Sequence, residues 1–158
     1  MEREEEHARR YQTFEDLEVY QVAREFRKAM YRIAKRLPAI EKFGLASQVR
    51  RASLSLTNNI AEGHGRYHYL EQIKFTLQSR GSLEELIDDL NVCEDEQYLP
   101  VQEIRSLKRE GWRVRQPIDG YIRYLRGQKN SRGFSSVQEP SAAYDNADEL
   151  EDDSRISI

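Results

Sequence analysis

Apolar residues recur at steps of three and four along most of the chain, which is the spacing of helices that bury one face. The first such stretch places apolar side chains at Val19, Ala23, Phe26, Met30, Ile33 and Leu37. Thr13 can cap the start of this helix, and Pro38 disfavours helical backbone in the residue before it. The pattern therefore predicts a first helix from Thr13 to about Leu37.

Three further helices are predicted over about 42–63, 69–97 and 100–126, joined by short connections. The apolar residues expected to face inward are Leu45, Val49, Ala52, Leu56 and Ile60 in the second helix, Leu70, Ile73, Leu77, Ile87 and Leu90 in the third, and Val101, Ile104, Leu107, Val114, Ile118 and Leu125 in the fourth. Gly81 and Ser82 replace bulky side chains in the third helix and predict a notch for close helix packing. Pro100 suits the first turn of the fourth helix, whereas Pro117 is expected to kink that helix.

Four helices without a convincing alternating strand pattern predict an all-α, antiparallel up-down-up-down four-helix bundle, which we expect over residues 13–128. Residues 1–12 are expected to form a flexible N-terminal segment. Residues 129–158 are rich in small, polar and acidic residues, and such a composition cannot bury enough apolar surface to fold alone. We expect a disordered acidic C-terminal tail, whose commoner role is a solvating extension and whose alternative role is to bind a partner.

The net charge of −3 hides an uneven distribution of charge along the predicted bundle. Residues 67–99 hold 2 basic and 8 acidic groups, whereas residues 100–128 hold 7 basic and 3 acidic groups. These opposite charges either face each other within one bundle or draw neighbouring protomers together in a head-to-tail ring. The sequence leaves both arrangements open.

The residue types also exclude several classes of protein. No apolar run approaches the roughly 20 residues of a membrane span, and the first residues lack the apolar block of a secretory signal, so we expect a cytoplasmic protein. The single cysteine, Cys93, lies among apolar neighbours and is interpreted as a packing residue. The chain contains no phosphate loop, dinucleotide fingerprint or nucleophile elbow, and we expect neither an enzyme nor a cofactor.

Metal binding is also not favoured by the spacing of the histidines and carboxylates. The Glu-x-x-His spacing of di-iron bundles is absent. His64, His68 and Glu71 would suit a metal only on one continuous helix, which Gly65 interrupts. The acidic cluster of Glu84, Glu85, Asp88 and Asp89 is interpreted as solvated surface or a partner contact rather than as paired catalytic acids.

The second helix carries polar residues on both flanks of its apolar stripe, and each of them needs a hydrogen-bond partner if it is buried. These residues are Arg51, Ser55, Asn58, Asn59 and Glu62. The helix then ends at the sequence Gly63-His64-Gly65, where glycine allows a break and a close approach of the next helix. This pattern indicates a helix that specifies its partners.

Four strings in the chain resemble the four-helix-bundle 23S rRNA intervening-sequence protein family, which is related to the accessory variability proteins of diversity-generating retroelements. The strings are FEDLEVYQVA (14–23), FGLASQVRRAS (43–53), SLTNNIAEGHGR (55–66) and GSLEEL (81–86). The resemblance covers about residues 13–128 and implies a bacterial, non-enzymatic bundle that assembles into a homopentamer. Accessory proteins of this kind associate with a reverse transcriptase and its RNA. The residues that match the motifs, which we interpret as structural and assembly residues, are Arg51, Asn59, Glu62, Gly63, Gly65, Arg66, Gly81, Ser82 and Glu84.

The fourth helix combines cations with aromatic residues, a composition that can contact phosphates and stack bases. The candidate nucleic-acid-binding residues are Arg105, Lys108, Arg109, Arg113, Arg115 and Arg123, with Trp112, Tyr121 and Tyr124 between them. The alternative is a solvated basic face beside aromatic core residues. The sequence therefore predicts a non-enzymatic, homo-oligomeric scaffold, pentameric by preference, with a possible nucleic-acid role; the alternative is an accessory subunit that binds a reverse transcriptase and its RNA.

Overall fold

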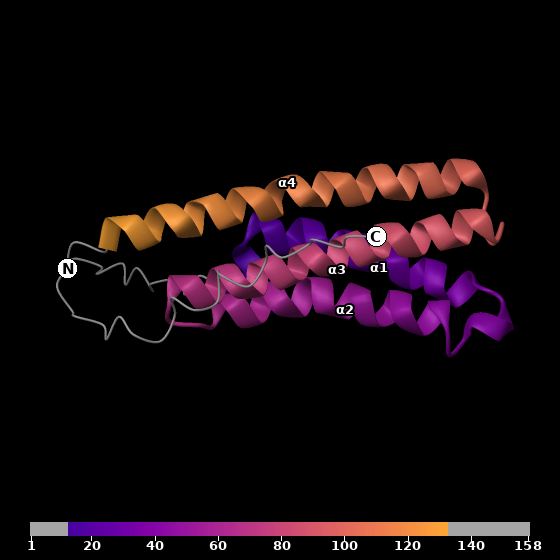
Figure 1. Ribbon diagram of the computed structural model, residues 1–158, viewed down its shortest axis with the longest axis horizontal. Coiled ribbons are helices and arrows are strands. Elements are labelled where there is room, and N and C mark those ends of the chain that lie inside the picture. Colours follow the sequence, from indigo (N-terminus) through magenta and orange to yellow (C-terminus); the bar gives the residue numbers. More distant parts are fainter. Residues whose placement is uncertain (1–12, 133–158) are drawn as a thin grey trace, which may run out of the picture.

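Four long helices run side by side along the axis of the molecule (Figure 1). The computed structural model describes residues 13–132, and its helices are α1 (Glu18–Arg36), α2 (Leu45–His64), α3 (Tyr69–Asp95) and α4 (Val101–Arg132). Two short 3-10 turns, η1 (Phe14–Asp16) and η2 (Ala39–Glu41), precede α1 and α2. The predicted up-down-up-down bundle is confirmed. The expected flexible N-terminal segment and nearly all of the expected acidic tail lie outside the described residues.

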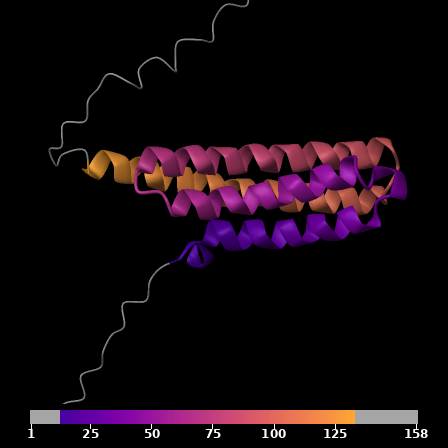
Figure 2. The same ribbon diagram turned by 90° about the horizontal axis from the view of Figure 1, so that it is seen from below.

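Each helix packs against the next one along the chain, and α4 closes the bundle against α1 (Figure 2). The α1–α2 and α3–α4 connections lie at one end of the bundle, and the α2–α3 connection lies at the other (Figures 1 and 2). The C-terminal end of α4 projects past the α2–α3 connection in both views. The helix continues to Arg132, beyond residue 128, where we expected the bundle to end. Gly127 favours an earlier end, but residues 127–132 contain no proline, so the helix can continue through them.

Most of the apolar residues predicted to face inward form one continuous core. Leu77 is only partly buried against this core, and Ile87 is buried but is not part of it. Leu70 and Val101 were expected to face inward but are 55% and 43% exposed. Each lies in the first turn of its helix, at an end of the bundle, where a residue on the apolar face has few neighbours across from it. The three-and-four periodicity shows which face is apolar, but it does not show where the last layer of the core ends.

The first helix begins differently from the prediction. Thr13 forms a capping box with Asp16, but this box caps the short turn η1 rather than α1. Leu17 then has extended backbone, and α1 begins at Glu18. Proline has the expected effect, because α1 ends at Arg36, just before Leu37 and Pro38.

Glu41 joins the two connections at one end of the bundle. Its Oε2 accepts a hydrogen bond of 2.9 Å from the backbone N–H of Leu45, the first residue of α2, and its Oε1 accepts one of 2.8 Å from the Tyr98 hydroxyl. The hydrogen bond from Leu45 and the one from Tyr98 lower the pKa of Glu41. This carboxylate therefore supplies the helix cap that Gly44, the residue before α2, lacks.

Two glycines allow the helices to approach closely, and neither of them is Gly81. A Cβ on Gly63 would lie 2.9 Å from the Cβ of Phe75, and a Cβ on Gly111 would lie 2.5 Å from Cδ1 of Ile87. At Gly81 a Cβ would meet nothing within 4 Å. The notch predicted at Gly81 is therefore wrong within this bundle, since that residue faces outward. The close contacts are α2 with α3 at Gly63 and α4 with α3 at Gly111.

Proline at position 117 does not end α4, which runs through it as one helix. Pro117 has no N–H, so the carbonyl oxygen of Arg113 receives no hydrogen bond from the residue four positions later.

Candidate nucleic-acid interface

The cations predicted to bind nucleic acid divide into two sets by the direction in which α4 presents them. Lys108 and Arg115 point toward α3. The Lys108 Nζ lies 2.7 Å from Oε2 of Glu94, and this hydrogen bond lowers the pKa of Glu94. Arg115 forms ion pairs with Glu84 of α3 and with Asp119 of its own helix. Lys108 and Arg115 therefore form ion pairs that join α4 to α3.

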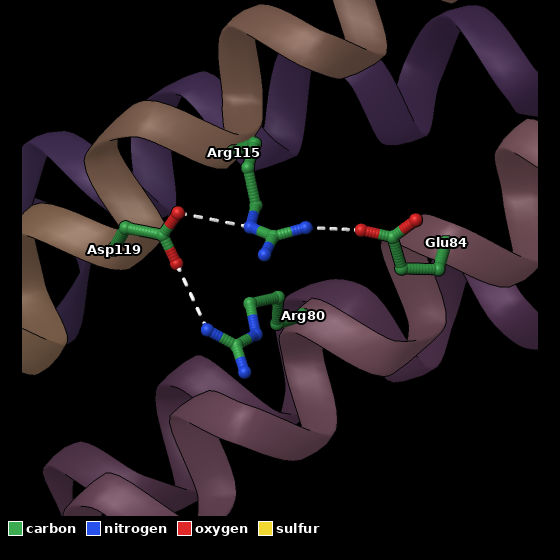
Figure 3. Close-up of polar contacts among 4 residues, drawn as sticks. All are labelled: Arg80, Glu84, Arg115 and Asp119. Atoms are coloured by element: carbon green, nitrogen blue, oxygen red, sulfur yellow. Dashed lines mark hydrogen bonds and ion pairs between the residues drawn. The ribbon is translucent and has the colours of Figure 1, made fainter.

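Arg115 belongs to a network of two arginines and two carboxylates, whose other members are Arg80, Glu84 and Asp119 (Figure 3). One carboxylate oxygen of Asp119 accepts a hydrogen bond of 2.9 Å from Nε of Arg115. The other oxygen accepts a hydrogen bond of 3.1 Å from Arg80. Partial burial of Asp119 opposes its ionisation, but the hydrogen bonds from Arg80 and Arg115 outweigh that effect and lower its pKa. Opposite charges of α3 and α4 thus meet inside one bundle, which is the first of the two arrangements that the sequence left open.

The second set of cations faces solvent. Arg105, Arg109, Arg113 and Arg123 are exposed, and none of them forms an ion pair with any part of the chain from residue 13 to 132. Two aromatic side chains are exposed on the same side of α4, Trp112 at 46% and Tyr124 at 58%. We call this surface the arginine face and define it as Arg105, Arg109, Trp112, Arg113, Arg123 and Tyr124. Tyr121, the third predicted aromatic residue, is partly buried beside the core.

The arginine face has the dimensions and chemistry of a surface for a polyanion. At 1.5 Å per residue, the distance from Arg105 to Arg123 is about 27 Å along the axis, which matches about eight phosphates of one duplex strand. A guanidinium group can donate two parallel hydrogen bonds to a phosphate, and an exposed aromatic ring offers a surface on which a base stacks. Glu110 lies at the margin of this face, where it borders a groove between α1 and α4.

That groove has an apolar floor and a charged rim. Val22, Phe26, Ala29 and Val114 form its floor, and Glu25, Arg32, Glu110 and Arg113 form its rim. The rim carries charges of both signs. Only Arg113 belongs to both the groove and the arginine face.

The motif residues of α2 and α3 lie mostly along the seam between these two helices. Ser82 donates to Oγ of Ser55 at 2.9 Å, and Asn59 donates to the Ser55 carbonyl oxygen and to its Oγ, both at 2.9 Å. Nη2 of Arg51 lies 3.8 Å from Oε1 of Glu85. These contacts supply the hydrogen-bond partners that the polar residues of α2 require.

The remaining motif residues lie at the end of α2. Glu62 and Arg66 form an ion pair of 2.7 Å. Gly65 follows the last residue of α2 and donates its N–H to the carbonyl oxygens of Ala61 and Glu62. Its backbone is in the right-handed region, with φ of −76°, so the turn does not require the left-handed conformation that favours glycine. Gly63 is the position at which a glycine is needed, because Phe75 lies so close.

Two buried polar residues of α3, Ser79 and Asp89, were not predicted from the sequence. The hydroxyl of Ser79 donates to the carbonyl oxygen of Leu56 at 2.6 Å in a fully buried position. A signal for this seam exists, because Ser79, Ser82, Leu86, Asp89 and Cys93 follow one another at steps of three and four. All five are buried. Because Ser79, Ser82 and Asp89 are polar, a search for apolar residues does not find this stripe, although its spacing is that of a buried helix face.

Ser79 provides a test of the hydrogen bond across this seam. Ser79→Ala leaves the Leu56 carbonyl oxygen without the donor from α3, and we expect a loss of about 1 kcal/mol in the free energy of unfolding. Ser106→Ala, at a half-buried position of α4, is a control with the same chemical change. Urea denaturation of both variants measures the difference, and equal stability would show that the hydrogen bond contributes nothing.

Asp89 is the one member of the acidic cluster that is buried, with 5% of its surface exposed. Its Oδ2 accepts no hydrogen bond from the described part of the chain. Burial, and then the charges of Glu85 and Asp88, raise its pKa to about 6, while Arg51 acts in the opposite direction. The cluster is therefore not uniform, since Glu84 is ion-paired with Arg115 and Asp89 is enclosed between helices.

The described residues present neither a metal site nor a membrane-spanning helix. Within residues 13–132, no three histidine, cysteine or carboxylate side chains converge in a way that could hold a metal ion. His64 is the last residue of α2 and His68 precedes α3, so the two imidazoles flank a turn. Over the same residues, no helix has the length and hydropathy needed to cross a membrane.

The model of a family described as 23S rRNA-intervening sequence protein matches residues 15–120. The matched span begins in η1 and ends within α4, so it includes α1, α2 and α3 completely. A search of curated proteins finds no match to the chain.

Proposed function

Because the chain belongs to the 23S rRNA-intervening sequence protein family, we propose that it is a non-catalytic helical scaffold that binds RNA along the arginine face of α4. The observation that carries this proposal is the row of four exposed arginines beside Trp112 and Tyr124, none of the four in an ion pair among the described residues. Phosphate contacts supply most of the affinity of sequence-independent binding, and aromatic rings add stacking that tolerates any base. We place this activity in the cytoplasm.

The state of the reactive groups supports a non-catalytic role. Glu84 and Asp119 are engaged with Arg115 and so are not positioned as a free acid and base pair. Cys93 is buried, and that burial, followed by the charges of Asp89 and Glu41, raises the pKa of its thiol to about 11. A thiol with such a pKa is almost entirely protonated at neutral pH and is a poor nucleophile.

RNA binding is tested by replacing the three arginines in the first half of the face. In Arg105→Gln/Arg109→Gln/Arg113→Gln, we expect at least a tenfold loss of affinity for a single-stranded RNA at about 50 mM salt, because three phosphate contacts are removed. The slope of log affinity against log salt concentration should become shallower by about 2, since each contact with a single strand contributes about 0.7. Fluorescence anisotropy of a labelled RNA measures both quantities.

A matched control has the same loss of charge elsewhere. Lys35, Lys42 and Lys74 are exposed and form no ion pair among the described residues, and none lies on α4. The triple variant Lys35→Gln/Lys42→Gln/Lys74→Gln should retain affinity within about twofold if binding is local to the arginine face. An equal loss in both variants, or no RNA binding by the parent protein, would contradict the proposal.

Self-association is the second candidate function, and exposed apolar side chains favour it. Ile40 and Phe43 are 85% and 89% exposed at one end of the bundle, and Tyr67 and Leu70 are 89% and 55% exposed at the other. Surfaces at opposite ends that differ from each other permit a head-to-tail contact, and such a contact generates a ring when the rotation between neighbouring protomers closes. We propose a homo-oligomer, with a pentamer as the preferred state. Light scattering coupled to size exclusion measures the mass, and a monomer at micromolar concentration would contradict this assembly.

The role of an accessory subunit for a reverse transcriptase is an alternative that rests on the family resemblance described above. It predicts that the protein copurifies with a reverse transcriptase and its RNA when the two are coexpressed. Failure of the enzyme to bind the protein in the presence of that RNA would remove this alternative and leave the RNA-binding scaffold.

A further inference from the structure

The arginine face carries four arginines that form no ion pair within residues 13–132, although the charge of Arg105 acts on Glu94 of α3. The carboxylates of α3 that could have neutralised it are already used, since Glu84 and Glu94 bind Arg115 and Lys108. Arg105, Arg109, Arg113 and Arg123 thus remain available to an external anion or to another part of the chain.

The chain itself contains an anionic segment that complements this face. Residues 139–153 hold 7 acidic groups and no basic group. We propose that this acidic segment binds the arginine face of α4 within the same molecule and competes there with RNA phosphates. The competition with RNA rests on the function proposed above, whereas the binding of the segment to α4 stands independently of it.

The length of the chain after α4 permits this contact. Asp145 follows Arg132, the last described residue, by 13 positions, and a connection of that length spans at most about 45 Å when extended. Along the axis of α4, Arg123 lies about 14 Å from Arg132 and Arg105 lies about 40 Å from it. The acidic residues can therefore reach every arginine of the face without the help of a second molecule.

Attachment to α4 also compensates for the weakness of each contact. A single exposed ion pair contributes little, commonly less than about 1 kcal/mol. A segment tethered by a short connection has an effective concentration on the order of millimolar, so several weak contacts suffice to occupy the face. RNA then has to displace the segment, and the affinity of the full chain for RNA is lower than that of the bare arginine face.

The position of the only tryptophan provides a readout that does not depend on RNA. Trp112 lies on the arginine face and is 46% exposed in the bundle formed by residues 13–132. A segment bound over this face shields the indole ring from acrylamide, a neutral quencher that does not respond to charge. Fluorescence quenching therefore reports whether the face is covered.

The experiment compares the full chain with a full-length variant in which the acidic segment is neutralised. The substitutions are Glu139→Gln, Asp145→Asn, Asp148→Asn, Glu149→Gln, Glu151→Gln, Asp152→Asn and Asp153→Asn. In the neutralised variant, we expect acrylamide to quench Trp112 at least 1.5-fold more strongly, and we expect RNA affinity to rise by about three- to tenfold at about 50 mM salt. Both differences should disappear at about 0.5 M salt, where exposed ion pairs are screened.

The face variant Arg105→Gln/Arg109→Gln/Arg113→Gln serves as the control, because neutralising the segment in that background should leave the quenching of Trp112 unchanged. Equal quenching of the parent and the neutralised chain would overturn the proposal, as would a difference that grows with protein concentration, which indicates the segment of another copy. If quenching changes while neither protein binds RNA, the segment binds α4 and the RNA-binding function alone is wrong.

Discussion

Asp89→Asn is expected to stabilise the protein by about 2 kcal/mol at pH 8 and to have almost no effect at about pH 3. The carboxylate is buried between helices, its Oδ2 accepts no hydrogen bond from the described residues, and burial raises its pKa to about 6. The ordinary pKa of the group is 3.8. Between pH 3.8 and about pH 6, the Asp89 carboxyl therefore keeps its proton in the folded state and releases it in the unfolded state.

The sign of the effect follows from this difference. At pH values below about 4 both states are protonated, and Asp89 does not affect the pH dependence of folding. As the pH rises from about 4 to about 6, the unfolded chain ionises first, so the free energy of unfolding falls, by about 3 kcal/mol in total for a shift of this size. Asparagine cannot ionise and removes this decrease, although its buried amide also needs partners, which reduces the expected gain.

Urea denaturation at pH 3 and at pH 8 measures the prediction. Asp95→Asn is the matched control, because Asp95 is exposed at the C-terminal end of α3 and is not one of the charges that act on Asp89. The charged groups that act on Asp89 are Glu85 and Asp88 on α3 and Arg51 on α2. Equal stabilisation by Asp89→Asn at both pH values would show that packing, rather than ionisation, is responsible.

Gly63→Ala is expected to destabilise the bundle by about 1–3 kcal/mol, although alanine is the better helix former. The new methyl group would lie 2.9 Å from the Cβ of Phe75 and 3.3 Å from the carbonyl oxygen of Gln72. Neither atom can rotate away, since one is attached directly to the backbone and the other belongs to it. The α2 and α3 helices would have to separate at this contact.

Gly81→Ala makes the same chemical change at a solvent-exposed position and should have the opposite effect on stability. A Cβ at that position meets no atom within 4 Å, so the substitution should stabilise α3 by about 0.5–1 kcal/mol. Thermal denaturation of the two variants gives the comparison. If Gly81→Ala instead lowers the mass of an oligomer, Gly81 contacts a neighbouring protomer. If Gly63→Ala leaves the thermal stability unchanged, the end of α2 can shift at little cost in free energy.

The sequence predicted most of the fold because a bundle depends on a simple periodic pattern. Steps of three and four identified the four helices and the core residues of α1 and α2. The exceptions, Leu70 and Val101, lie where helices begin, and periodicity carries no information on how far a neighbouring helix extends. The role of each glycine depends on the residue that faces it, and that is decided by how α2, α3 and α4 are aligned along their axes.

The sequence predicted which residue types make up the candidate site, but it did not predict in which direction each side chain points. The sequence showed that one helix is acidic and the next is basic, yet it could not show that Lys108 and Arg115 turn toward α3 whereas Arg109 turns to solvent. Lys108 and Arg109 point about 100° apart around the helix, but both lie outside the apolar stripe of α4, and that stripe does not show on which of its flanks α3 packs. Only the position of α3 determines which of them finds a carboxylate.

Pro117 gives the arginine face a mechanical property as well as a chemical one. The missing hydrogen bond between Pro117 and Arg113 lowers the stiffness of α4 at one point, and helices bend most readily where their ladder is interrupted. This point divides the face into a half with Arg105, Arg109 and Arg113 and a half with Arg123 and Tyr124. A curved ligand that contacts both halves is therefore expected to flex α4 at this joint, while the packing of the other three helices stays as it is.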